Sequence, residues 1–154
     1  MSDIEKEYNL LAKKYKLPPF KELNSDFEIS GMENADFLLK GILVKIGEKL
    51  EFYNGILSEV LQPDASSLSG MHETRFFNDT EKSGMYRLFK RMMGHYRAII
   101  GMILKNDGKE QAAFLCSFSS EWKETKEELL LYVGKMKDSW SKETTIKEDL
   151  GYFG

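Results

Sequence analysis

Apolar residues recur every three or four positions along three long stretches of the chain, and this spacing limits the fold more than any other feature. Alternating steps of four and three keep side chains on one face of an α-helix. In the first stretch the pattern is carried by Leu39, Leu43, Ile46, Leu50, Tyr53, Leu57 and Val60. Such a seven-residue repeat is typical of the buried seam of a helical bundle.

Two later stretches show comparable spacing. The second stretch carries Met85, Phe89, Met92, Tyr96, Ile99 and Ile103. The third carries Leu115, Phe118, Trp122, Thr125, Leu129, Val133, Met136 and Trp140, which fall within one arc of a helix. We therefore expect long helices over 34–62, 80–106 and 109–140, with a turn-rich loop over 63–79.

Short helices are expected before the first long one. Ile4, Tyr8, Leu11 and Tyr15 share a helical stripe, and the prolines of KLPPF end that helix because a residue before proline is pushed out of the helical region. Residues 20–27 can form a second short helix, and 1–30 together form an N-terminal docking segment. The tail 141–154 is weakly periodic and is expected to fray or to dock. These elements predict one all-α domain over 1–154, an antiparallel bundle of three long helices plus one or two short N-terminal helices.

The composition indicates the cellular location that we expect for this bundle. The chain of 154 residues is long enough for a core without disulfides, and its single cysteine, Cys116, has no internal partner. No stretch approaches the roughly 18 apolar residues of a membrane span, and the N-terminus lacks the apolar run of a signal peptide. We expect a cytoplasmic protein that does not enter a membrane and needs no cofactor.

Positive charge is concentrated in the second long stretch. Residues 82–106 contain six lysines and arginines and no acid, so the rest of a chain with net charge −3 carries −9. On a helical wheel Arg87, Lys90, Arg91 and Arg97 share one arc that points away from the apolar stripe. We call these four residues the basic face.

Three interpretations of the basic face remain open. It can be a solvated helix surface, which is the usual meaning of a charge run. It can bind nucleic acid or another polyanion, with arginine forks on phosphates. It can meet acids of a protein partner or a second copy, because Glu121, Glu124 and Glu128 lie on the outward side of the last helix. We expect a non-enzymatic interaction or scaffold protein that self-associates, with polyanion binding as the alternative.

The segment RMMGHYR is similar to the Arg-x4–6-His motif of HEPN ribonucleases, which are also helical bundles and carry that motif on a late helix. Here three residues separate Arg91 from His95, which is fewer than the motif requires. The resemblance implies a minor alternative, a metal-independent ribonuclease-like bundle in which His95 transfers a proton and Arg91 steadies the phosphate.

The turn-rich loop holds the other candidate polar cluster. His72 and Glu73 are adjacent there, and Arg75 follows closely. The chain contains neither a His-x-x-x-His nor a Glu-x-x-His pair, so we expect no metal site of the zinc-protease or di-iron type. These three residues, with His95, are predicted only to flank a site.

Overall fold

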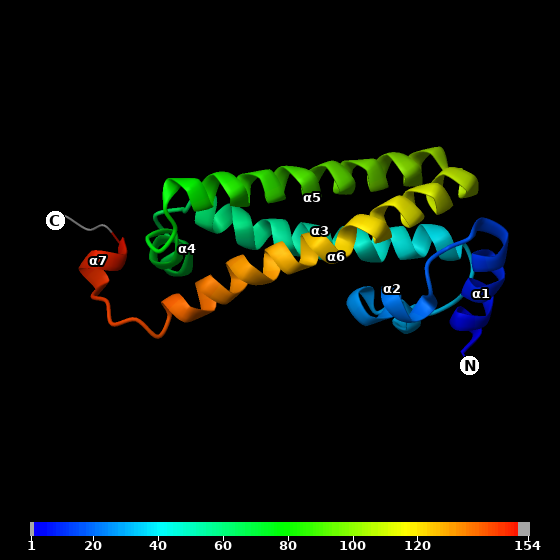
Figure 1. The fold of residues 1–154 in the computed structure, drawn as a ribbon, viewed down its shortest axis with the longest axis horizontal. Helices are drawn as coiled ribbons and strands as arrows, with labels where there is room; N and C mark the ends of the chain where they lie inside the picture. Colours follow the sequence, from blue (N-terminus) through cyan, green and yellow to red (C-terminus); the bar gives the residue numbers. More distant parts are fainter. Residues whose placement is uncertain (1, 151–154) are drawn as a thin grey trace. The chain divides into compact units, whose positions relative to one another are not determined.

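A computed structural model describes residues 2–150, and every regular element in that range is a helix. In chain order these are α1 (Asp3–Tyr15), α2 (Phe20–Phe27), the 3-10 helix η1 (Ile29–Gly31), α3 (Leu38–Leu61), α4 (Leu68–Thr74), α5 (Asp79–Lys105), α6 (Gly108–Ser139) and α7 (Ile146–Leu150), coloured along the chain in Figure 1. The prediction of an all-α fold with three long helices and short N-terminal helices is confirmed. None of the helices in this range is both long and apolar enough to cross a membrane.

The described chain packs into two compact units, each built from parts of the three long helices. Within the described residues, unit 1 comprises 2–51 together with 94–123, and unit 2 comprises 52–93 together with 124–150. The prediction of a single domain concerns how these two units fold together, and it stays a prediction.

The helix ends follow local chemistry that is readable from the sequence. Asn78 and Glu81 form a reciprocal capping box at the start of α5: the Glu81 amide donates to Asn78 Oδ1 at 2.8 Å, and the Asn78 amide donates to Glu81 Oε1 at 3.0 Å. At the other end Asn106 adopts a left-handed conformation with φ 55°, and Asp107 accepts from the first amides of α6. Asparagine tolerates that conformation, so α5 and α6 are separated by a very short connection.

Unit 1 has an aromatic core between α2 and α6. The rings of Phe27, Phe118 and Trp122 contact one another, with centroid separations of 5.2–5.8 Å. The indole Nε1 of Trp122 donates to Asp26 Oδ2 at 3.0 Å, which satisfies the one polar atom of that side chain. Tyr8 is fully buried and donates to the Pro18 carbonyl, and burial raises the pKa of its phenol. The N-terminal helices are therefore docked through apolar rings with satisfied polar ends.

The long helices run antiparallel within each unit. In unit 2, Lys135 on α6 pairs with Glu81 on α5, and Glu128 pairs with Arg91. In unit 1, Glu121 pairs with His95, and Glu110 with Lys105. Partner numbers fall on α6 as they rise on α5, which is the pattern of antiparallel neighbours. Asn54 Nδ2 of α3 donates to the Phe89 carbonyl of α5 at 3.3 Å, which joins these two helices in unit 2.

The structure corrects three details of the sequence analysis. The predicted loop 63–79 contains the helix α4, which begins because Ser67 Oγ accepts from the Gly70 amide at 3.1 Å. The first long helix begins at Leu38 and not at 34, since the Asn34 side chain instead accepts from the Asp36 amide. Val133 and Trp140, assigned to the core arc of the last helix, are exposed.

Close packing of α4 on α3 generates a stability prediction. A Cβ added at Gly70 would lie 2.9 Å from the backbone carbonyl oxygen of Glu59, whereas one added at Gly55 would meet no atom within 4 Å. Gly70→Ala should lower the free energy of unfolding by about 1–3 kcal/mol because backbone cannot move aside easily. Gly55→Ala, within the exposed side of α3, should raise it by up to about 1 kcal/mol through helix propensity.

Urea unfolding followed by circular dichroism measures both changes. Equal effects of the two substitutions would contradict the close contact between α4 and α3.

Candidate functional site

The basic face is exposed in the structure. Arg87, Lys90, Arg91 and Arg97 all present their side chains to solvent from α5, and the first three belong to unit 2 while Arg97 belongs to unit 1. Lys90 lies over the ring of Tyr86 at 5.2 Å, and Arg97 lies over the ring of Tyr96 at 5.5 Å. The role of these residues in binding a polyanion stays a prediction.

Arg91 has a partner in its own chain, which the sequence analysis did not expect. Its Nη2 lies 2.5 Å from Glu128 Oε2 on α6, with both side chains partly exposed. A pair of this kind in contact with water stabilises by roughly 0–1 kcal/mol. One of the outward glutamates assigned to a partner's charge is therefore engaged within unit 2.

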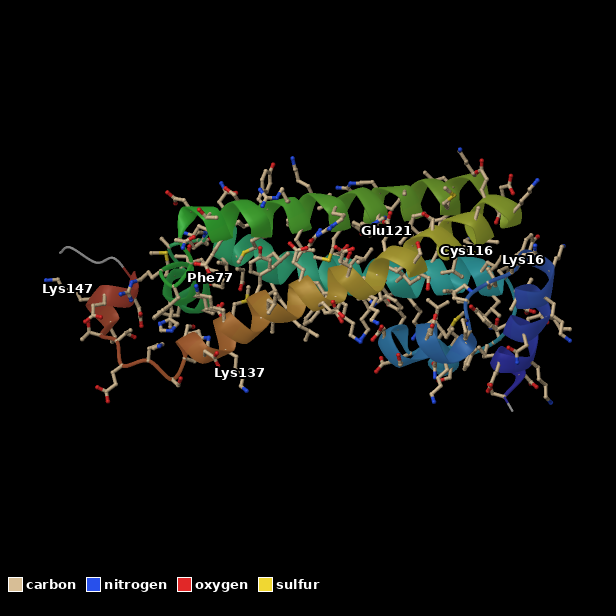
Figure 2. The ribbon with its side chains drawn as sticks, in the orientation of Figure 1. Lys16, Phe77, Cys116, Glu121, Lys137 and Lys147 are labelled. Atoms are coloured by element: carbon tan, nitrogen blue, oxygen red, sulfur yellow. The ribbon has the colours of Figure 1, made fainter. Side chains whose placement is uncertain are left out.

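His95 also has carboxylate and aromatic neighbours. Its Nε2 lies 3.3 Å from Glu121 Oε2, and its ring stands edge-on to Phe118 at 5.3 Å. Glu121 is labelled on α6 in Figure 2. In the ribonuclease-like alternative Arg91 and His95 would act on one phosphate, but here each engages a different glutamate, and the two pairs belong to different units.

Cys116 is half-buried, and its Sγ lies 3.5 Å from the backbone carbonyl oxygen of Lys16, the residue that follows α1 (Figure 2). Among residues 2–150, no group of three or more histidine, cysteine, aspartate or glutamate side chains has the arrangement of a metal site.

His72, Glu73 and Arg75 come together with residues from the far end of the chain. His72 is only 3% exposed, and its Nδ1 lies 2.7 Å from Asp149 Oδ1 on α7, although 77 residues separate the two in sequence. Arg75 Nη1 lies 2.6 Å from the same oxygen. Thr144 Oγ1 donates to the other oxygen, Asp149 Oδ2, at 2.8 Å. One carboxylate is thus held by an imidazole, a guanidinium and a hydroxyl.

Both ring nitrogens of His72 have hydrogen-bond partners. Its Nε2 lies 2.9 Å from the Ser139 carbonyl oxygen, which can only accept, so Nε2 carries a proton. Desolvation works to raise the pKa of Asp149, but the hydrogen bonds from Thr144 and His72 and the charges of His72 and Arg75 outweigh it and lower that pKa. Asp149 is therefore an accepting carboxylate, and it lies at the other ring nitrogen of His72, Nδ1.

Two aromatic rings contact the imidazole of His72. Trp140 stacks on the imidazole of His72 with a centroid separation of 4.1 Å and an interplanar angle of 26°, and Phe76 lies 5.1 Å from it. Trp140 Nε1 donates to Glu73 Oε2 at 3.0 Å. All three predicted flanking residues of the turn-rich segment therefore contribute to one site, which we call the His72 site.

A second candidate lies in unit 1 around Phe37. This side chain is 79% exposed, and its backbone has φ 53° in the left-handed region. Phe37 lines two surface hollows. One has a volume of about 580 Å³ and is also lined by Met32 and Val44, and the other has a volume of about 350 Å³ and is also lined by Leu11 and Leu38. We call Phe37 and these two hollows the Phe37 surface, and none of the eight predicted site residues lines it.

Comparison with protein-family models, curated proteins and solved structures gives no match for this chain. Function must therefore be inferred from the sites themselves. Sequence reasoning missed Phe37, Trp140 and Asp149 as site residues. A positive φ leaves no signal at a phenylalanine, and nothing in the local sequence pairs Asp149 with a histidine 77 positions away.

Asp149 makes the docking of α7 sensitive to acid. Its pKa lies below the ordinary value of 3.8, so the contribution of its carboxylate to docking is fully present above pH 3.8 and is lost as the pH falls through the lowered pKa. In a Trp122→Phe variant the emission of Trp140, which stacks on His72, should report an acid transition centred below pH 3.8.

Asp149→Asn in the same background is the control and should remove that transition. A transition that survives this substitution, or one centred above pH 3.8, would show that Asp149 does not control the site.

Proposed function

We propose that this chain is a non-enzymatic interaction protein, and that it associates with a second copy through the Phe37 surface of unit 1. One observation carries the proposal: a large aromatic side chain is 79% exposed on a backbone held at φ 53°. For an L-residue other than glycine that conformation costs about 1–2 kcal/mol. Because the ring is exposed, packing within the isolated chain does not offset this cost.

The position of Phe37 distinguishes it from the other left-handed residues of the described chain. Lys16, Glu28 and Asn106 adopt positive φ at helix C-termini, where this conformation commonly ends a helix. Phe37 instead lies before the first residue of α3, where its carbonyl accepts from the Gly41 amide at 3.0 Å. Helix termination therefore does not account for its strain. Burial of the ring against a partner would return roughly 1.5–3 kcal/mol.

Charge around the larger hollow favours a second copy as the partner. Glu33 and Asp36 lie on the segment before α3, while Lys40 and Lys45 lie on α3 itself. A two-fold interface places the same patch on both subunits, so acids at one position must meet bases at another. The larger hollow offers this self-complementary arrangement, with Met32 and Val44 as apolar parts of its lining.

Phe37→Gly tests the proposal because it should separate association from stability. Glycine relieves the positive φ, so the free energy of unfolding at low concentration should rise by about 1 kcal/mol. Association should nevertheless be lost, because the ring is gone. Sedimentation velocity across protein concentrations and urea unfolding measure the two quantities.

Matched variants complete that experiment. Phe37→Ala should lose association without the gain in stability, since alanine keeps the strain. Phe52→Ala removes a ring that is 63% exposed in unit 2 and should still associate. A monomeric wild-type chain at every concentration, or equal association of all variants, would overturn the proposal.

Polyanion binding through the basic face is the second candidate function. It is favoured by the exposure of Arg87, Lys90 and Arg97 on a helix that has no acid over 82–106. Such binding should weaken steeply with salt because counterions compete for phosphates. A packed apolar contact should depend on salt far less.

An electrophoretic shift with mixed RNA and DNA tests this alternative. Arg87→Glu with Lys90→Glu should abolish a shift seen with the wild-type chain at low salt. The control is Lys123→Glu with Lys137→Glu, which makes the same change in net charge at exposed positions of α6. A shift lost equally in both double variants would indicate net charge alone. RNA that is cut only when His95 is present would instead support the ribonuclease-like alternative.

A further inference from the structure

The His72 site recognises a carboxylate with groups that belong to the body of unit 2. His72 and Arg75 lie three residues apart at α4, and both contact Asp149 Oδ1, at 2.7 and 2.6 Å. Arg75 Nη2 also lies 3.8 Å from Glu148, so the guanidinium faces two acids of α7. Hydrogen bonds from charged donors to a carboxylate are about twice as strong as neutral ones.

The contacts that orient the His72 side chain do not involve α7. The Ser139 carbonyl at the end of α6 accepts from His72 Nε2, and Trp140 stacks on the ring while its indole donates to Glu73. Thr74 Oγ1 donates to the Val60 carbonyl at 2.7 Å, which ties α4 to the end of α3. None of these contacts involves α7, so the imidazole keeps its orientation without Asp149.

Of the side chains described in α7, Asp149 makes the two short contacts with His72 and Arg75, and Glu148 adds a longer one with Arg75. The helix α7 has five residues and is too short to be stable alone. Ile146, its apolar residue with a described side chain, is 76% exposed. Lys147 and Glu148 are also exposed. The segment therefore resembles a bound acidic peptide that happens to be tethered to its receptor.

We propose that α4 carries a carboxylate-recognition site formed by His72, Arg75 and Trp140, that Asp149 fills it as a tethered ligand, and that an aspartate-containing acidic peptide of a partner protein binds there when α7 leaves. This site lies in unit 2 and its residues are not those of the Phe37 surface, so it does not depend on self-association. A tethered ligand competes through its high effective concentration, which keeps the site closed to weak peptides.

The charged groups around the site favour a carboxylate ligand over a neutral one. Asp149 and Glu148 approach from α7, while Arg75 and Glu73 belong to α4. Glu73 is occupied by the indole of Trp140, which leaves His72 and Arg75 as the two donors facing the ligand. An amide in place of the carboxylate would either turn an N–H₂ group toward these donors or offer them an oxygen without negative charge, and both arrangements weaken the two bonds.

The test uses the full chain and a labelled synthetic peptide with the sequence of residues 141–150. In Asp149→Asn the tethered ligand loses its charge, so this variant should bind the peptide at least ten-fold more tightly than the wild-type chain does, as measured by fluorescence anisotropy. The same peptide with asparagine in place of its aspartate should bind at least ten-fold more weakly to Asp149→Asn.

Two further variants separate recognition from folding. Adding Arg75→Gln to Asp149→Asn should reduce peptide binding at least ten-fold while circular dichroism stays unchanged, because the Arg75 side chain is partly exposed. Adding His72→Gln to Asp149→Asn should also reduce peptide binding at least ten-fold. If the buried His72 is needed for folding, the Arg75→Gln variant alone decides the test. Equal binding of the two peptides, no binding by Asp149→Asn, or binding that is indifferent to Arg75→Gln would each overturn the proposal.

Discussion

The register between α5 and α6 is the constraint on which the rest of the structure depends. Within each unit two cross-helix pairs join these helices, Glu81 with Lys135 and Arg91 with Glu128 in unit 2, and His95 with Glu121 and Lys105 with Glu110 in unit 1. Exposed pairs contribute roughly 0–1 kcal/mol each, whereas burying one leucine or methionine contributes about 1.5–3 kcal/mol. The pairs therefore select an alignment that the apolar seams stabilise.

This register supplies part of the reason for the uneven distribution of charge along the chain. Residues 82–106 carry only bases, while the facing helix α6 places Glu121 and Glu128 opposite His95 and Arg91. Opposite charge on neighbouring helices disfavours a shifted alignment, because a one-turn slip would separate the partners. Arg87, Lys90 and Arg97 remain outside these pairs in the described contacts between α5 and α6, so this register does not account for their charge.

The sequence predicted the three long helices and the two N-terminal helices well and missed the short helix α4, for a physical reason. A long helix buries a periodic seam, so its ends could be placed within a few residues, and the capping box of Asn78 and Glu81 was recognisable locally. The short helix α4 has no such period, and it is held by the Ser67 cap and by the contact of Thr74 with Val60. The pairing of His72 with Asp149 is a tertiary contact between distant positions, and one sequence carries no signal for it.

The two candidate sites differ in how their free energy is stored. At the His72 site both ring nitrogens and Arg75 Nη1 already have partners, so the energy is realised in the folded chain and a partner gains only by displacing Asp149. At the Phe37 surface the ring is exposed and the backbone is strained, so the energy is unrealised until something covers the ring. Binding of a partner at the His72 site should therefore compete with Asp149, and its strength should depend on charge and on the tether. Binding at the Phe37 surface displaces nothing, so it should depend on buried apolar area and on protein concentration.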